Sequence, residues 1–133
     1  YAGARVLLAE DEPINREVAR ELLEEAGLMV EIAIDGAEAL TMARRAEYDL
    51  ILLDLQMPKM NGIEATWAIR ALPGRRMPIV ALTANAFDED RQRCLEAGMD
   101  DHIAKPVDPE ALFATVQRWL AAYGGSGRDG ARG

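Results

Sequence analysis

Short apolar runs alternate along the chain with longer stretches in which apolar residues recur at helical spacing. Five runs have the length and composition of β-strands, at residues 5–9, 29–33, 50–54, 78–83 and 101–104. The first, third and fourth are apolar nearly throughout, which is typical of strands that are covered on both faces. Residues 29–33 alternate between apolar and polar side chains, which favours a strand at the edge of a sheet.

Five stretches with helical patterning follow these strands in turn, at residues 12–27, 37–46, 62–72, 88–98 and 108–123. The first stretch carries apolar residues at four-residue spacing, namely Ile14, Val18, Leu22 and Ala26. Asp35-Gly36, just before the second stretch, and Asn61-Gly62, where the third stretch begins, predict turns. The strict alternation of strands and helices predicts a mostly parallel sheet with helices on both faces and right-handed crossovers.

The composition of the chain favours one folded domain and limits the kinds of partner that it can bind. The chain has 133 residues, 50% of them hydrophobic, which suits a single α/β domain over residues 1–123 followed by a flexible, Gly-rich tail at 124–133. The net charge of −8 argues against nucleic acid or an anionic membrane surface as a direct partner, and leaves proteins and cations. No apolar run approaches the roughly 20 residues of a membrane span.

Two further features concern the protein as a whole. The single cysteine, Cys94, excludes an internal disulfide and fits a reducing compartment. We therefore expect a cytoplasmic location, either for the domain itself or for the cytoplasmic part of a membrane-anchored parent chain. The first residue is Tyr1 rather than Met, so we expect a piece cut from a longer protein or a processed chain.

Polar residues stand where four of the predicted strands end. Glu10 and Asp11 follow the first strand, Asp54 ends the third, Thr83 ends the fourth and Lys105 follows the fifth. Because ligands of open α/β sheets bind at the carboxyl ends of the strands, we expect these side chains to converge at one edge. The apolar run before Asp54 makes this carboxylate costly to bury unless a cation or a hydrogen-bond donor compensates its charge.

The convergence of these residues predicts a particular chemistry. Three carboxylates this close together repel one another unless a cation lies between them. Oxygen ligands from two loops suit a hydrated Mg²⁺, with Mn²⁺ as the alternative. With a metal bound, Asp54 stays ionised and can act as a nucleophile towards phosphorus. The metal, Lys105 and Thr83 would meet the charge that grows on a transferring phosphoryl group, so the residues predict a metal-assisted phosphoryl acceptor.

Four segments of the chain resemble the motifs of the response-regulator receiver domain of two-component signalling: VLLAEDEPINR, DLILLDLQMPKMNG, PIVALTANA and DDHIAKPVD. The resemblance runs in order from about Arg5 to Tyr123. It implies a flavodoxin-like (βα)5 doubly wound parallel sheet with strand order 2-1-3-4-5, and Asp54 as the phosphoacceptor. It also implies a Mg²⁺ site made by Asp11, Asp54, the backbone carbonyl of Gln56 and, through water, Glu10.

The same resemblance assigns roles to residues that face the phosphoryl group. Thr83 and Lys105 would hold the phosphoryl oxygens, and Lys105-Pro106 would be a cis peptide. Thr83 and His102 would form a switch, in which His102 turns inward on phosphorylation and changes the surface made by residues 84–123.

The resemblance also bears on phosphate lifetime and on partners. Gln56 and Asn85 would flank the path of the attacking water and tune the lifetime of the acyl phosphate. Glu10 in place of the commoner Asp, the pair Asn15-Arg16 and the segment LTANA resemble the receivers of hybrid sensor histidine kinases. The first helix around Asn15 and Arg16 would dock a histidine kinase or a histidine phosphotransfer protein. A dimer or an output partner would use the face made by residues 88–123.

Three alternatives compete with this interpretation. An aspartyl-phosphate phosphatase of the haloacid dehalogenase class carries a second acid two residues after its nucleophile, where this chain has Gln56. The isolated domain is therefore expected to catalyse only its own phosphorylation and dephosphorylation. A flavin-binding flavodoxin needs a phosphate loop rich in Ser, Thr or Gly after the first strand, where this chain has the acidic segment EDEPIN. A receiver-like module that is never phosphorylated is disfavoured because the acidic residues, Thr83 and Lys105 are all present.

Overall fold

The computed structural model describes residues 3–55, 57, 60–74, 77–83, 88–105 and 107–124, and for residues 88–91, 123 and 124 it describes the backbone alone. Five parallel strands form one sheet in the order β2-β1-β3-β4-β5. Their bounds are β1 Arg5–Ala9, β2 Met29–Ala33, β3 Leu50–Asp54, β4 Ile79–Thr83 and β5 Asp101–Ala104. The predicted strands, the strand order and the edge position of β2 are confirmed. Only β4 differs, because it begins one residue later than predicted.

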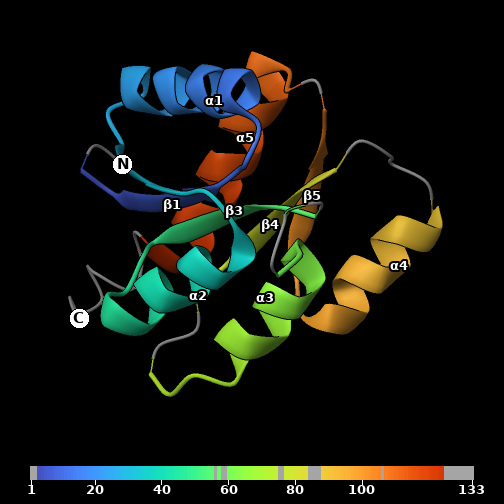
Figure 1. The fold of residues 1–133 in the computed structure, drawn as a ribbon. Coiled ribbons are helices and arrows are strands. Elements are labelled where there is room, and N and C mark those ends of the chain that lie inside the picture. The colour runs from blue at the N-terminus through green and yellow to red at the C-terminus, as the bar shows by residue number, and fades with distance from the viewer. Residues whose placement is uncertain are drawn as a thin grey trace.

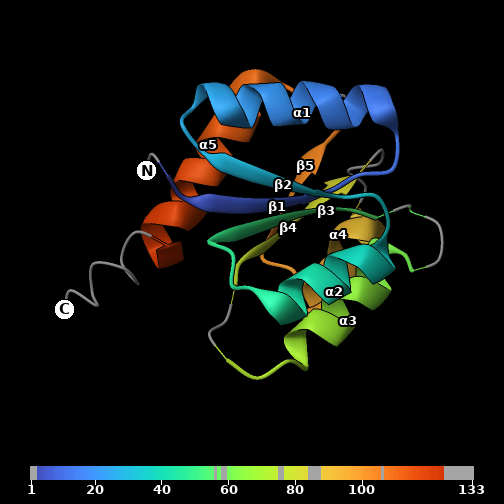
Figure 2. The same cartoon turned by 60° about the vertical axis from the view of Figure 1, so that its left-hand side comes forward.

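Five helices connect and cover the strands. They are α1 Pro13–Glu25, α2 Gly36–Arg45, α3 Gly62–Arg70, α4 Asp88–Ala97 and α5 Pro109–Trp119, and α5 continues into the short π-helix η1 Leu120–Gly124. Helices α1 and α5 cover one face of the sheet, while α2, α3 and α4 cover the other (Figures 1 and 2). In the described part of the chain, no helix combines the length and the apolar character that crossing a membrane requires.

The core consists of two apolar layers, one on each face of the sheet. Alternate residues of each strand enter opposite layers, so that Leu53 packs under α2, α3 and α4 while Leu52 packs under α1 and α5. All four apolar residues of β3, Leu50–Leu53, have no exposed surface. Burying a leucine side chain stabilises a fold by about 1.5–3 kcal/mol. This run therefore fixes β3 firmly in the sheet and holds Asp54 at its carboxyl end.

The apolar face of α1 differs from the one that four-residue spacing suggests. Ala19 and Leu23 are buried and Leu22 is partly buried, but Ile14 is 71% exposed and Val18 is 45% exposed. One turn of an α-helix takes 3.6 residues, so a step of four residues goes slightly beyond one turn. A stripe of apolar residues at four-residue spacing therefore drifts around the helix. Its amino-terminal half therefore points to solvent, close to the carboxyl edge of the sheet.

The two glycine pairs that predict turns prove to be helix caps. Asp35 and Asn61 precede α2 and α3, and their side chains accept hydrogen bonds from the backbone N–H groups of Glu38 at 2.8 Å and Glu64 at 2.9 Å. The Glu64 carboxylate in turn accepts from the Asn61 N–H at 3.1 Å, which completes a capping box. Gly62 is the first residue of α3, where the predicted helical stretch begins, and Gly36 is the first residue of α2 rather than the second residue of a turn.

Candidate functional site

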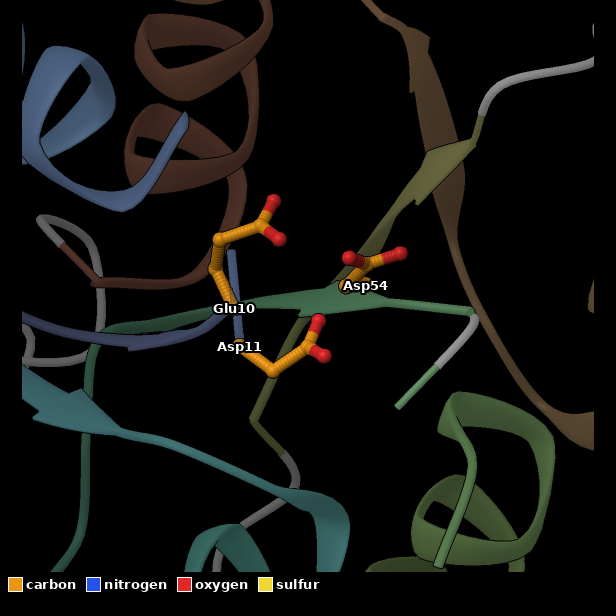
Figure 3. A group of neighbouring side chains, drawn as sticks. All are labelled: Glu10, Asp11 and Asp54. Carbon is orange, nitrogen blue, oxygen red and sulfur yellow. The ribbon is translucent and has the colours of Figure 1, made fainter. Parts of the chain in front are cut away.

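Three carboxylates lie together at the carboxyl edge of the sheet. Glu10 and Asp11 follow β1, Asp54 ends the neighbouring strand β3, and the three side chains face one another (Figure 3). One carboxylate oxygen from each lies within 4.8 Å of the others. Glu10 is 1% exposed and Asp54 is 2% exposed, whereas Asp11 is open to solvent. The predicted acidic cluster is therefore assembled, with one side accessible to a ligand.

The Glu10 carboxylate has one oxygen that fits a cation. Its Oε2 accepts a hydrogen bond from the Glu12 N–H at 3.2 Å. Its Oε1 is buried and has no hydrogen-bond partner among the described residues, and the Lys105 ammonium nitrogen lies 3.6 Å away. A buried oxygen without a donor is energetically costly. A cation or a water molecule bound to it would remove this cost. The carboxylate oxygens of the cluster therefore fit Mg²⁺ as its ligands.

Burial and the neighbouring Asp54 carboxyl together raise the pKa of Glu10 to about 7, although the Glu12 N–H and the Lys105 charge act to lower it. The Glu10 side chain is therefore close to half protonated near neutral pH when no cation is bound. A divalent cation would favour the ionised form, because its charge offsets the repulsion from Asp54.

Lys105 makes the direct contact to the central carboxylate. Its Nζ donates a hydrogen bond to Asp54 Oδ2 at 2.9 Å. Burial lowers the pKa of Lys105, but the hydrogen bond to Asp54 and the charges of Asp54 and Glu10 outweigh that effect, so the pKa is raised overall. The Lys105 N–H also donates to the Thr83 carbonyl at 2.8 Å, which continues the pairing of β4 and β5 by one residue. The backbone thus fixes the position from which the ammonium reaches Asp54.

Thr83 and His102 lie on the two strands that lead to Lys105. Thr83 is the last residue of β4, is 5% exposed and pairs with Ala104. His102 pairs with Ala81, two residues before Thr83, and is partly exposed. With residues of α4 and the start of β5, it lines a small pocket of about 150 Å³. Thr83 therefore lies at the edge where the acidic cluster stands, and His102 lies further along the sheet, beside α4.

Several predicted site features fall outside the described residues. Gln56, Asn85 and Pro106 are not among them. The Gln56 carbonyl as a metal ligand, the roles of Gln56 and Asn85 in phosphate lifetime and the Lys105-Pro106 cis peptide therefore stay predictions.

The start of α1 joins the acidic cluster in a way that the sequence did not indicate. Glu12 caps α1, since its side chain accepts from the Asn15 N–H at 2.9 Å, although glutamate is not among the preferred cap residues. Arg16 Nη1 lies 3.5 Å from the Glu10 carbonyl oxygen. Asn15 and Arg16 are half-buried, and Ile14 beside them is much more exposed. The first turn of α1 is therefore built against the acidic cluster.

Fold and site together define a class: a doubly wound α/β domain with an acidic cluster and a lysine at the carboxyl edge of its sheet. The response regulator receiver domain family matches residues 6–117. The chain belongs to this family, as its motifs predict.

Comparison with individual relatives shows which receiver domains the chain is similar to. It is 38% identical over 127 residues to hybrid signal transduction histidine kinase I of Dictyostelium discoideum, and the match covers 90% of this chain but 7% of that kinase. The receiver domain of sensor histidine kinase PA1611 from Pseudomonas aeruginosa, solved with a magnesium ion in its active-site cleft, is 45% identical with a TM-score of 0.84, over 90% of this chain and 99% of that one. The chain is thus similar to receiver domains of hybrid histidine kinases, and it spans a small part of the length of such kinases.

A third relative was solved with a protein partner. The complex of the histidine phosphotransfer protein Ypd1 with the receiver domain of Ssk1 from Saccharomyces cerevisiae contains a chain that is 30% identical to this one. Its TM-score is 0.83, and the match covers 90% of each chain.

Proposed function

We propose that this receiver domain accepts a phosphoryl group from a phosphohistidine onto Asp54. The observation that carries the proposal is the position of Asp54, which is buried at the end of β3, 2.9 Å from Lys105 Nζ and within the acidic cluster. In the reaction an Asp54 oxygen forms a bond to phosphorus, the phosphorus–nitrogen bond breaks, and its electron pair leaves with the imidazole nitrogen. The product is an aspartyl phosphate, which serves as the signal.

Each residue around Asp54 would have its own role in this transfer. Lys105 would hold a phosphoryl oxygen and neutralise part of its charge, since its ammonium already lies beside Asp54. Thr83, at the end of the adjacent strand, would donate its hydroxyl to a second oxygen. Glu10, Asp11 and Asp54 would hold Mg²⁺, which supplies positive charge opposite the transferring phosphoryl group. The magnesium ion in the cleft of the PA1611 receiver supports this assignment.

The phosphodonor would dock on the first turns of α1. This helix begins directly after the acidic cluster, and Ile14 and Val18 expose apolar surface there beside Asn15 and Arg16. A donor histidine must approach Asp54 within bonding distance, so its protein must contact the surface around the cleft. The complex of Ypd1 with a related receiver supports a histidine phosphotransfer protein as the partner.

The expected result of incubating the chain with acetyl phosphate and Mg²⁺ is the gain of one phosphoryl group, measured by intact mass. Asp54→Ala removes the nucleophile and abolishes the gain, and omission of Mg²⁺ strongly slows it. Asp108→Asn is the matched control, because this exposed carboxylate caps α5 and asparagine is an equally good cap. This variant is expected to behave like the unmodified chain.

Two other results would contradict the proposal and point elsewhere. If the unmodified chain gains no phosphoryl group under conditions that label another receiver, the domain is a binding module that is never phosphorylated. If it turns over a phosphate ester steadily instead of holding the group, it is an aspartyl-phosphate phosphatase.

Phosphorylation would be read out through His102. A phosphoryl group on Asp54 would draw Thr83 inward, and His102 would turn into the space that this opens, which changes the face made by residues 84–123. A dimer or an output partner would then bind the part of this face at residues 88–123. The beryllofluoride complex is expected to shift the His102 ring signals in NMR spectra, and Thr83→Val, which keeps the shape but lacks the hydroxyl, is expected to suppress the shift. Identical His102 signals with and without beryllofluoride would exclude the switch.

A further inference from the structure

Two helices on the same face of the sheet begin with a buried glycine directly after the capping residue. Gly36 opens α2 after Asp35, and Gly62 opens α3 after Asn61. Glycine is a poor helix former, so its presence at the first position of a helix calls for a reason in the packing. In both cases the reason is lack of room for a side chain.

Gly62 packs on the backbone of the phosphoacceptor strand. Its N–H donates to the Leu55 carbonyl at 3.0 Å. A Cβ atom at this position would lie 2.5 Å from the Asp54 carbonyl oxygen and 2.9 Å from the Leu55 Cα. Both are backbone atoms, and the Leu55 N–H is bonded to the Leu82 carbonyl at 3.1 Å, so they cannot move independently of the sheet.

Gly36 packs on the chain that leads into α3. A Cβ atom at Gly36 would overlap the backbone carbonyl oxygen of Met60, two residues before Gly62. The start of α2 therefore presses on the start of α3, and the start of α3 presses on Asp54 and Leu55. Because Met60 is already in contact with Gly36, the start of α3 has little room to retreat from the strand.

We propose that Gly36 and Gly62 are positioning residues that set the place of the Asp54 carboxylate in the acidic cluster. This inference rests on the proposed function, because it concerns the same carboxylate. A methyl group at Gly62 would displace the Asp54–Leu55 peptide directly, and one at Gly36 would act on it through Met60 and the start of α3. Because the Asp54 carboxylate is attached to this backbone by a short side chain, it would move as well. The cluster has little tolerance, since Asp54 must stay 2.9 Å from Lys105 Nζ and near both Glu10 and Asp11.

The test measures Mg²⁺ affinity by calorimetry and phosphoryl gain by intact mass in Gly36→Ala and Gly62→Ala. Residues that orient metal ligands typically change affinity by about 10–100-fold, so both variants are expected to weaken Mg²⁺ binding by about tenfold. Phosphoryl gain is expected to slow by about tenfold or more, because small misplacements are costly in transfer reactions.

Ile69→Ala is the matched control. Ile69 is buried on the last turns of α3, and its truncation lowers the melting temperature of the domain without touching Asp54. It is expected to leave the Mg²⁺ affinity of the folded domain unchanged. Positioning is thereby separated from stability, because a structural role alone would give the glycine variants the same outcome as the control.

An NMR titration of the unmodified chain with Mg²⁺ provides a measurement that needs no variant to fold. The amide signals of Gly36 and Gly62 are expected to shift, and those of Gly74 and Gly98, which follow the carboxyl ends of α3 and α4, are expected to stay. Unchanged Mg²⁺ affinity in folded alanine variants, or a Gly36 signal that does not respond, would overturn the inference. If the unmodified chain binds Mg²⁺ but takes no phosphoryl group, the proposed function fails while the affinity comparison still decides the role of the glycines.

Discussion

Lys105→Ala is expected to slow phosphoryl gain from acetyl phosphate by about a hundredfold, which is the order of loss when one preorganised charge partner is removed from a transfer site. The ammonium lies 2.9 Å from Asp54 Oδ2, so under the proposed function it would face the charge that builds up on the incoming phosphoryl group. Intact mass against time gives the rate. Lys105→Arg keeps the charge on a larger, planar group, so it is expected to recover only part of the rate.

Lys105→Ala is also expected to bind Mg²⁺ a few-fold more tightly than the unmodified chain does. Lys105 Nζ is 2.9 Å from Asp54 and 3.6 Å from Glu10, so its charge competes with the metal for both carboxylates. Slower transfer combined with tighter metal binding cannot result from a general loss of structure. Arg44→Ala, at the carboxyl end of α2 on the opposite edge of the sheet, is the control that should change neither quantity. An undiminished transfer rate in Lys105→Ala would show that Lys105 is not the charge partner of the phosphoryl group.

The stability of the metal-free domain is expected to fall as the pH rises from about 4.5 to about 8. The pKa of Glu10 is raised from 4.5 to about 7 in the folded domain, so the folded state binds this proton more tightly than the unfolded state does. Over that interval the folded state carries more protons, and the free energy of unfolding therefore decreases with pH. A pKa difference of this size corresponds to about 3 kcal/mol at 1.36 kcal/mol per pKa unit.

Urea denaturation in EDTA at pH 5 and pH 8 measures this loss. Glu10→Gln removes the titrating group and should flatten the dependence, and it should make the metal-free domain more stable than the unmodified chain at pH 8. Glu21→Gln, at an exposed position on α1, is the matched control and should retain the full slope. Saturating Mg²⁺ should reverse the trend, because the metal binds the ionised carboxylates. If the stability of the metal-free domain does not depend on pH in this interval, the pKa of Glu10 is not raised in the folded domain.

Much of the fold was predictable because its strands are buried on both faces. Runs such as Leu50–Leu53 are apolar at every position, as expected of strands covered on both faces, whereas residues 29–33 alternate between apolar and polar side chains. The strands and the edge position of β2 therefore follow from the pattern. The strand order came from the resemblance of the motifs rather than from periodicity. The exposed side of α1 was not predictable from four-residue spacing, because Ile14 and Val18 look like core residues until the helix is docked.

The site residues were predictable from one rule, that polar residues at the carboxyl ends of parallel strands meet at one edge. That rule brings Glu10, Asp54 and Lys105 together but cannot say which oxygen lacks a donor. That Glu10 Oε1 has no hydrogen-bond donor among the described residues, and that the pKa of Glu10 is raised, depends on distances between segments far apart in the chain. The Asp35-Gly36 and Asn61-Gly62 pairs were predicted as turns for a related reason. Aspartate or asparagine followed by glycine occurs in turns, and it also occurs where a helix cap is followed by a glycine in a close packing contact.

The residue that carries the phosphoryl group can be identified directly by treating the phosphorylated chain with borohydride, which reduces an acyl phosphate to an alcohol. Peptide mass spectrometry is expected to find homoserine in place of aspartate at position 54 and nowhere else. The same treatment of a chain that was not exposed to acetyl phosphate should leave Asp54 unchanged. A phosphoryl group found on His102, the single histidine of the chain, or on any residue other than Asp54 would contradict the assignment of Asp54 as the acceptor.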